Sequence, residues 1–185
     1  MKLSPAEQAR FVALAKNITE RPVYQTLKSF TQHGSVTTYR HSLHVALCAF
    51  RLNIRLHVRA DERELVEACL LHDFYLYDWH TKGDKLHGYH HPKIAAERAR
   101  RYFAVPDRVA SAIQTHMWPL TLFHVPRNRT AWLLAAADKI CAVRETLDRG
   151  RNRRSGPFFT GFGRPGPLGA VKSVENDGKW NRKNG

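Results

Sequence analysis

Residues 65–73, LVEACLLHD, form an apolar helical pattern that ends in two ionisable side chains. Leu65, Cys69 and His72 recur with the 3.6-residue period of an α-helix, so His72 is expected on the apolar face. Asp73 follows about 100° further round, at the expected end of the helix. A carboxylate is costly to bury without a partner, and a metal ion held jointly with the histidine is a suitable one. The segment therefore predicts a buried helix that delivers metal ligands at its end.

Histidine and aspartate side chains recur in the same setting elsewhere in the chain: His41, His91, His116 and Asp138. His116 continues the apolar face of residues 109–113, and Asp138 continues that of residues 134–135. Six imidazole and carboxylate groups on separate segments favour a metal centre inside a helical bundle, and hence an enzyme. Taken singly, each histidine is more simply a hydrogen-bonded core residue, and Asp138 the buried partner of an arginine.

The composition is that of an ordinary globular domain, with 43% hydrophobic and 25% charged residues in a chain of 185. Its longest apolar runs are too short to span a membrane, and its N-terminus lacks the apolar core of a signal peptide. Three cysteines, Cys48, Cys69 and Cys141, lie in apolar helical patterns. We expect them to be reduced core residues of a cytoplasmic protein with no membrane partner.

Helix start signals and apolar periodicity predict an all-α bundle of six or seven helices. The expected helices cover about 5–20, 22–33, 38–56, 61–73, 92–103, 106–117 and 129–149, counting the second as a short one. Residues 75–91 are polar, aromatic and glycine-containing, and are expected to form a loop of functional length. No sustained strand-like alternation is present in the sequence.

The formal net charge is +14, which favours anionic partners, although solubility alone is an equally good explanation. Residues 151–185 hold eight basic and two acidic side chains, so they carry +6 and leave +8 on residues 1–150. Their closely spaced glycines and prolines exclude helix and leave little core to bury. We predict a helical metal-binding domain over 1–150 and a mobile basic tail over 151–185.

Three stretches of this chain resemble the motifs of the HD-domain phosphohydrolase superfamily. The opening motif is residues 38–46 (TYRHSLHVA), the central one residues 70–73 (LLHD), and the closing one residues 137–139 (ADK). The resemblance covers about residues 36–148 and implies an HD-domain-like helical bundle. It implies a core metal site of His41, His72, Asp73 and Asp138.

Two more histidines match positions found in the binuclear branches of that superfamily: His91, which a proline follows, and His116. His44, His87 and His90 lie close enough in sequence to compete for the roles given to His41 and His91. Gly88-Tyr89-His90 stands where the cyclic-dinucleotide branch has Gly-Tyr-Pro, so that substrate is not supported. The segment around Asp73 resembles an uncharacterised bacterial subgroup.

The resemblance implies a metal-dependent phosphohydrolase that acts on phosphomonoesters or phosphodiesters, with nucleotides among the candidate substrates and one or two divalent ions. Fe, Mn, Co, Ni and Zn are not distinguished by the sequence. We assign Asp73 and His72 to catalysis, with Asp73 bridging two metals and a metal-activated water as nucleophile. Lys82, Lys85 and Lys139 are candidates to bind an anionic phosphate-containing small molecule or nucleotide, although solvated surface charge is the simpler explanation for each.

Two other functions remain open at this stage. The same fold and ligands suit a two-iron oxygenase, which iron content and oxygen consumption would distinguish from a hydrolase. The basic tail also suits weak contact with nucleic acid, in which case the metal site would be structural. Six ligands argue against the latter, since a structural metal needs only about four. The oligomeric state is not predicted.

Overall fold

The computed structural model describes residues 3–33, 36–76 and 87–148. Within these residues lie seven α-helices, one short 3₁₀ helix and one two-stranded sheet, which confirms the predicted all-α fold. No helix in the described ranges is long and apolar enough to cross a membrane. Lys82, Lys85 and the predicted tail 151–185 lie outside the described residues, so the division of the chain at residue 150 stays a prediction.

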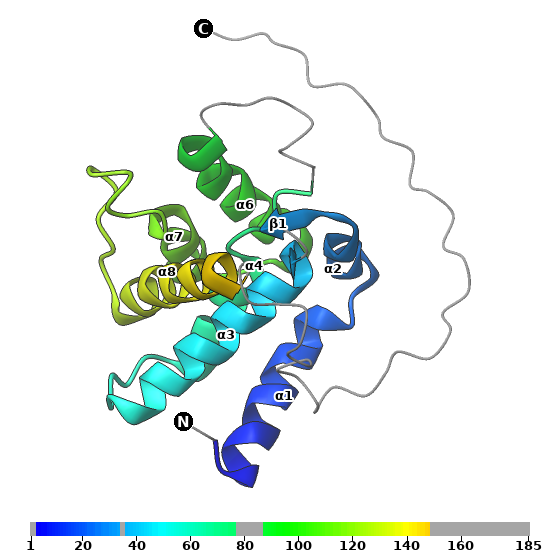
Figure 1. The fold of residues 1–185 in the computed structure, drawn as a ribbon, viewed down its shortest axis with the longest axis vertical. Coiled ribbons are helices and arrows are strands. Elements are labelled where there is room, and N and C mark those ends of the chain that lie inside the picture. The colour runs from blue at the N-terminus through cyan, green and yellow to red at the C-terminus, as the bar shows by residue number, and fades with distance from the viewer. Residues whose placement is uncertain (1–2, 34–35, 77–86, 149–185) are drawn as a thin grey trace, which may run out of the picture. The chain divides into compact units, whose positions relative to one another are not determined.

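The elements follow one another along the chain as shown in Figure 1. They are α1 (Pro5–Thr19), α2 (Pro22–Gln25), η1 (Thr26–Ser29), β1 (Thr31–His33), β2 (Val36–Thr37), α3 (Thr38–Arg55), α4 (Glu62–Leu71), α6 (His87–Phe103), α7 (Asp107–Thr115) and α8 (Arg129–Asp148).

Three of the predicted helix starts, those of α1, α3 and α4, are capped by side chains. Ser4 and Glu7 form a reciprocal capping box at the start of α1, and Asp61 Oδ1 accepts from the Glu64 amide at 2.8 Å to open α4. Thr37 Oγ1 accepts from the Arg40 amide at 3.3 Å and starts α3. These caps satisfy amides that have no partner within the helix, and so fix where each helix begins.

The core forms where α3 packs against α4 and α8, with α4 also against α1 and α7. In Figure 1, α3 and α8 run across each other beside the shorter α4. The side of α4 that faces this core is apolar. Four of its side chains are completely buried: Leu65, Val66, Leu70 and Leu71. The predicted free thiols are confirmed, with Cys69 and Cys141 buried and Cys48 half-buried.

The second predicted helix ends earlier than expected. Its α-helical part stops at Gln25, and Thr26–Ser29 continue as a 3₁₀ turn. Thr26 Oγ1 and Ser29 Oγ each donate to a carbonyl three residues back, at 2.7 Å, and so compete with helical bonding. The chain then forms the antiparallel pair β1–β2, which the sequence did not predict.

The start of α6 also differs from the prediction. The helix begins at His87, so Pro92 lies inside it and five residues of the predicted loop, 87–91, are helical. Proline near the first turn removes only one helical hydrogen bond, the one to the Gly88 carbonyl. A Cβ at Gly88 would lie 3.2 Å from Leu120 Cδ2 and 3.7 Å from Met117 Cε, so this position needs the close approach that glycine allows.

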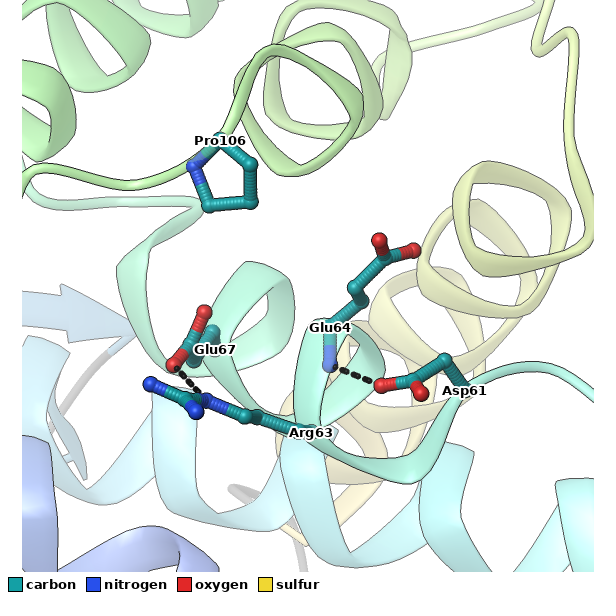
Figure 2. A pocket seen from close by; sticks show the side chains of 5 residues that line it. All are labelled: Asp61, Arg63, Glu64, Glu67 and Pro106. Atoms are coloured by element: carbon teal, nitrogen blue, oxygen red, sulfur yellow. Dashed lines mark hydrogen bonds and ion pairs between the residues drawn. The ribbon is translucent and has the colours of Figure 1, made fainter.

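An open hollow lies between the first turns of α4 and Pro106 (Figure 2). Within it, Arg63 Nε donates to Glu67 Oε1 at 3.0 Å, and Asp61 caps the helix. Asp61 stands at the opposite end of α4 from His72. The hollow is therefore separate from the predicted metal ligands.

Asn53 holds the turn between α3 and α4. Its side chain donates to the Ala60 carbonyl at 3.0 Å and accepts from the Ala60 amide at 2.9 Å, in buried surroundings. Between them, His57 and Arg59 adopt positive φ angles of 50° and 60°. This turn sets the direction in which α4 enters the core.

We expect Asn53→Ala to lower the free energy of unfolding by about 2–4 kcal/mol, because it leaves two buried backbone groups without partners. Urea denaturation of the full chain measures this. Asn17→Ala, at an exposed position of α1, is the matched control and should not destabilise. Equal effects of the two substitutions would contradict the assigned role of Asn53.

Candidate metal centre

All six side chains that the sequence singled out meet in one buried cluster. His41 comes from α3, His72 and Asp73 from the end of α4, His91 from α6, His116 from the end of α7, and Asp138 from α8. Five helices thus converge on one point, and every member except Asp138 is at least 95% buried, while the Asp138 side chain is 13% exposed.

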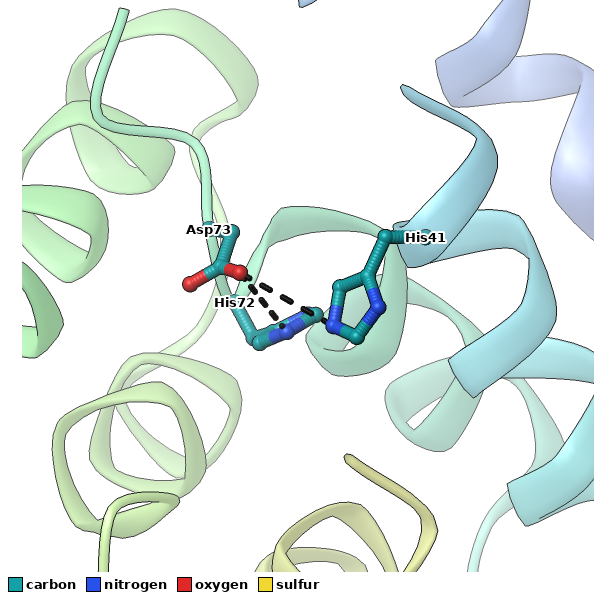
Figure 3. A group of neighbouring side chains, drawn as sticks. All are labelled: His41, His72 and Asp73. Carbon is teal, nitrogen blue, oxygen red and sulfur yellow. Dashed lines mark ion pairs between the residues drawn. The ribbon is translucent and has the colours of Figure 1, made fainter. Parts of the chain in front are cut away.

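The carboxylate of Asp73 stands between two groups of histidines. Its Oδ2 lies 3.2 Å from His72 Nε2 and 4.0 Å from His41 Nε2, as Figure 3 shows. Its Oδ1 lies 3.3 Å from His91 Nε2 and 3.9 Å from His116 Nε2. Each group of three offers ligand atoms that lie within 4.8 Å of one another, and Asp73 belongs to both.

Asp138 joins the first group. Its Oδ1 lies 3.1 Å from His41 Nε2 and 3.6 Å from His72 Nε2. The first group therefore holds two carboxylates and two imidazoles, whereas the second holds one carboxylate oxygen and two imidazoles. The two groups differ in negative charge.

Helix ends orient two of the histidines. His72 and His116 are the C-cap residues of α4 and α7, and each ring places Nδ1 against the carbonyl three residues back. The distances are 2.8 Å from His72 to the Cys69 oxygen and 2.7 Å from His116 to the Ile113 oxygen. A carbonyl only accepts, so Nδ1 carries a proton in both rings and Nε2 is the nitrogen turned to the cluster. The unpaired carbonyls of a helix end thus set the ligand tautomer.

The second group contains neutral imidazole. Burial, together with the nearby His72 and His91, lowers the pKa of His116 to about 3. Its Nε2 lies 3.1 Å from His91 Nε2. With its proton on Nδ1, His116 directs the lone pair of Nε2 toward His91, and a metal ligand needs such a lone pair.

The first group carries charge of both signs. Burial alone would lower the pKa of His41, but hydrogen bonds to Asp138 and Glu145 outweigh it and raise the pKa to about 9. The pKa of His72 is likewise raised, because the neighbouring Asp73 and Asp138 outweigh its burial. Against their own burial, the histidines hold the pKa of Asp73 and of Asp138 far below the usual range. Both carboxylates are therefore ionised.

The donor set fits a metal ion. His72 Nε2 and Asp73 Oδ1 are buried atoms that form no hydrogen bond with any described residue. Buried polar atoms in proteins are normally satisfied, so both point to a partner outside the protein. Imidazole nitrogen with carboxylate oxygen is the ligand chemistry of Zn, Mn, Fe, Co and Ni.

Two residues that the sequence analysis missed support the cluster. Glu145 accepts from His41 Nδ1 at 2.8 Å and from His44 Nδ1 at 2.9 Å. It lies two turns beyond Asp138 on α8, so the helical period contained a signal for it. Gln32, on β1, donates from Nε2 to Asp73 Oδ2 at 2.6 Å, and no sequence pattern indicated this.

Gln32 is itself fixed in one orientation. Its Oε1 accepts from the hydroxyl groups of Tyr75 and Thr38, the latter at 3.2 Å. The opposite amide orientation would place Oε1 against the ionised Asp73 carboxylate, which is unfavourable. The hairpin that carries Gln32 therefore orients the carboxylate shared by the two groups.

Neither His44 nor His90 belongs to the two groups of candidate ligands. His44 places Nδ1 on Glu145, His90 is exposed, and the side chain of His87 lies outside the described structure. Lys139 donates from Nζ to the His116 carbonyl at 2.9 Å and to the Ala135 carbonyl at 3.3 Å, and burial lowers its pKa. Lys139 thus ties α8 to the end of α7, while its role toward a substrate stays a prediction.

Comparison with known families agrees with this geometry: the model of the HD domain matches residues 38–143, more than half of the chain. The chain belongs to the HD-domain family. The resemblance carried by the His72-Asp73 pair and its flanking motifs is therefore confirmed. HD domains are generally metal-dependent hydrolases. Searches of curated proteins and of solved structures found no significant match.

Metal binding to this HD domain should release protons. His41, with its pKa raised to about 9, is charged at neutral pH and must lose its Nε2 proton to bind a metal. We therefore expect the apparent affinity for Co²⁺ to fall as the pH is lowered below about 9. If one proton is displaced, the fall should be about tenfold for each pH unit.

Calorimetric titration in buffers of different ionisation enthalpy measures the protons released. The matching pH series is followed by the visible absorption of Co²⁺. The aspartates do not contribute, because their pKa values lie far below this window. Affinity that stays constant between about pH 6.5 and pH 8.5 would contradict the charged state of His41.

Proposed function

We propose that this protein is a metal-dependent phosphohydrolase that cleaves phosphate esters at a binuclear centre. The observation that carries the proposal is the position of Asp73, whose two oxygens each face a separate group of ligand nitrogens. Asp73, His41, His72 and Asp138 would hold one metal ion, and Asp73, His91 and His116 the other. One carboxylate would thus serve both ions.

Divalent ions at such a centre would lower the pKa of water from about 15.7 towards about 7 and offset the charge on phosphate oxygens. The protein's own residues supply orientation. Gln32 fixes the Asp73 carboxylate, the carbonyls of Cys69 and Ile113 fix two imidazoles, and Glu145 fixes a third. Fixed ligands reduce the reorganisation that the reaction would otherwise require.

Substrate contacts belong to the same proposal. We retain Lys82, Lys85 and Lys139 as candidates to bind the phosphate group, since phosphoryl transfer needs positive groups near the equatorial oxygens. Phosphomonoesters, phosphodiesters and nucleotides are all candidate substrates. Nucleic-acid contact through residues 151–185 stays a prediction.

The first test is metal content together with hydrolysis. We expect full-length protein, purified without chelator or histidine tag, to contain up to two transition-metal ions per chain. It should release phosphate or p-nitrophenol from nucleoside monophosphates, p-nitrophenyl phosphate or its bis-ester under anaerobic conditions. Near-zero metal that cannot be restored would overturn the proposal, and iron with oxygen consumption but no hydrolysis would replace it with an oxygenase.

Asp73→Asn should lower kcat/KM by at least about 100-fold, because the amide is neutral and can no longer serve both groups of ligands. Metal content should fall in parallel. Asp107→Asn is the matched control, since that carboxylate is 94% exposed and pairs only with Arg100 among the described residues. An Asp73→Asn variant with full metal content and activity would show that Asp73 is not the shared ligand.

A further inference from the structure

Glu145 stands behind the first group of candidate ligands as a buried carboxylate. It is 9% exposed and uses both of its oxygens, Oε2 for His41 and Oε1 for His44. Both bonds cross from α8 to α3, so the carboxylate also joins the two helices that carry His41 and Asp138. Glu145 lies two residues beyond the segment that matches the HD-domain model.

The support for His41 differs in kind from that of the other anchored histidines. His72 and His116 rest on neutral backbone carbonyls, whereas His41 rests on a carboxylate. A carboxylate accepts the Nδ1 proton more strongly than a carbonyl does, which makes Nε2 a better donor to a metal ion. His41 should therefore be the strongest imidazole ligand of these three.

The charges around the two groups add to this difference. Asp138 lies 3.1 Å from His41 and 3.6 Å from His72, and Glu145 stands directly behind His41. The second group shares only the Oδ1 atom of Asp73. A divalent cation is attracted more strongly by the group that has more carboxylates, because the protein interior screens charge weakly.

We propose that Glu145 is a positioning residue that makes the site of His41, His72, Asp73 and Asp138 the tighter of the two metal sites, so that the two sites fill in order. This inference rests on the binuclear centre proposed above. His44 has a defined part in it, since its bond to Oε1 holds the Glu145 carboxylate toward α3. The two sites would then differ in metal affinity because their surrounding charges differ.

Glu145→Gln is the sharpest test, because glutamine keeps the shape but offers only one accepting oxygen for two Nδ1 protons. Titration of metal-free, full-length protein with Co²⁺ should resolve a tight and a weak equivalent in the unmodified chain. The substitution should weaken the first equivalent about 10–100-fold, as loss of an outer carboxylate behind a ligand histidine typically does. The second equivalent should change by less than about threefold, because Glu145 contacts neither of its histidines in the described structure.

A spectroscopic readout separates this role from general destabilisation. The visible absorption of the first Co²⁺ equivalent should shift in Glu145→Gln, whereas that of the second should not. Glu64→Gln removes the same charge at the far end of α4 and is the matched control. His44→Gln removes only one of the two bonds to Glu145, and should weaken the first equivalent less than Glu145→Gln does.

The outcomes are distinguishable. Two equivalents of equal affinity in the unmodified chain would overturn the inference while leaving the binuclear centre intact, and so would equal weakening of both equivalents by Glu145→Gln. If Glu145→Gln does not fold, His44→Gln serves as the test. An unchanged affinity of its first Co²⁺ equivalent would then overturn the inference. Failure of the unmodified chain to bind any Co²⁺ would overturn the proposed function itself.

Discussion

A single buried carboxylate organises this protein. Asp73 is 2% exposed, ionised, and placed so that each oxygen meets a different group of histidines. An isolated carboxylate in such surroundings would be protonated or strongly destabilising. The four helices that carry its histidine partners must therefore converge around the end of α4, and the packing of α3, α6 and α7 against α4 brings them there.

Helix termination supplies much of the precision at the site. The last carbonyls of a helix lack amide partners, and in both α4 and α7 one of them accepts the ring proton of the residue that caps the helix. One bond thereby satisfies the backbone and selects the imidazole tautomer. α4 ends at Leu71 and α7 ends at Thr115. Because the helices end there, His72 and His116 can turn Nε2 toward the cluster.

Helical periodicity placed the candidate ligands His72, His116 and Asp138 on apolar faces, where it is a strong signal. Resemblance to the HD-domain motifs assigned His41 and His91. The same reasoning failed where long-range pairing decides the structure. Gln32 reaches Asp73 from a pair of strands that have only three and two residues and no alternating pattern. Glu145 shares the helical face of Asp138, but an acidic residue late in a helix is usually solvent-exposed. Pro92 was predicted to start a helix, but the helix begins at His87, and Gly88 in its first turn lies close to Leu120 and Met117.

The supports of the cluster are independent of any bound ion. Three candidate ligands are held by bonds on the side of the ring away from the centre: His41 by Glu145, and His72 and His116 by helix-end carbonyls. Asp73 is held by Gln32, which the strand β1 carries. The charges within the cluster are balanced by protons on His41 and His72, whose pKa values are raised by the aspartates that the same ion would contact. Metal binding would then exchange protons for cations among side chains that are already held in place, so little folding free energy would need to come from the metal. Such a centre would differ in this respect from small structural zinc sites, in which the ion itself holds the fold together.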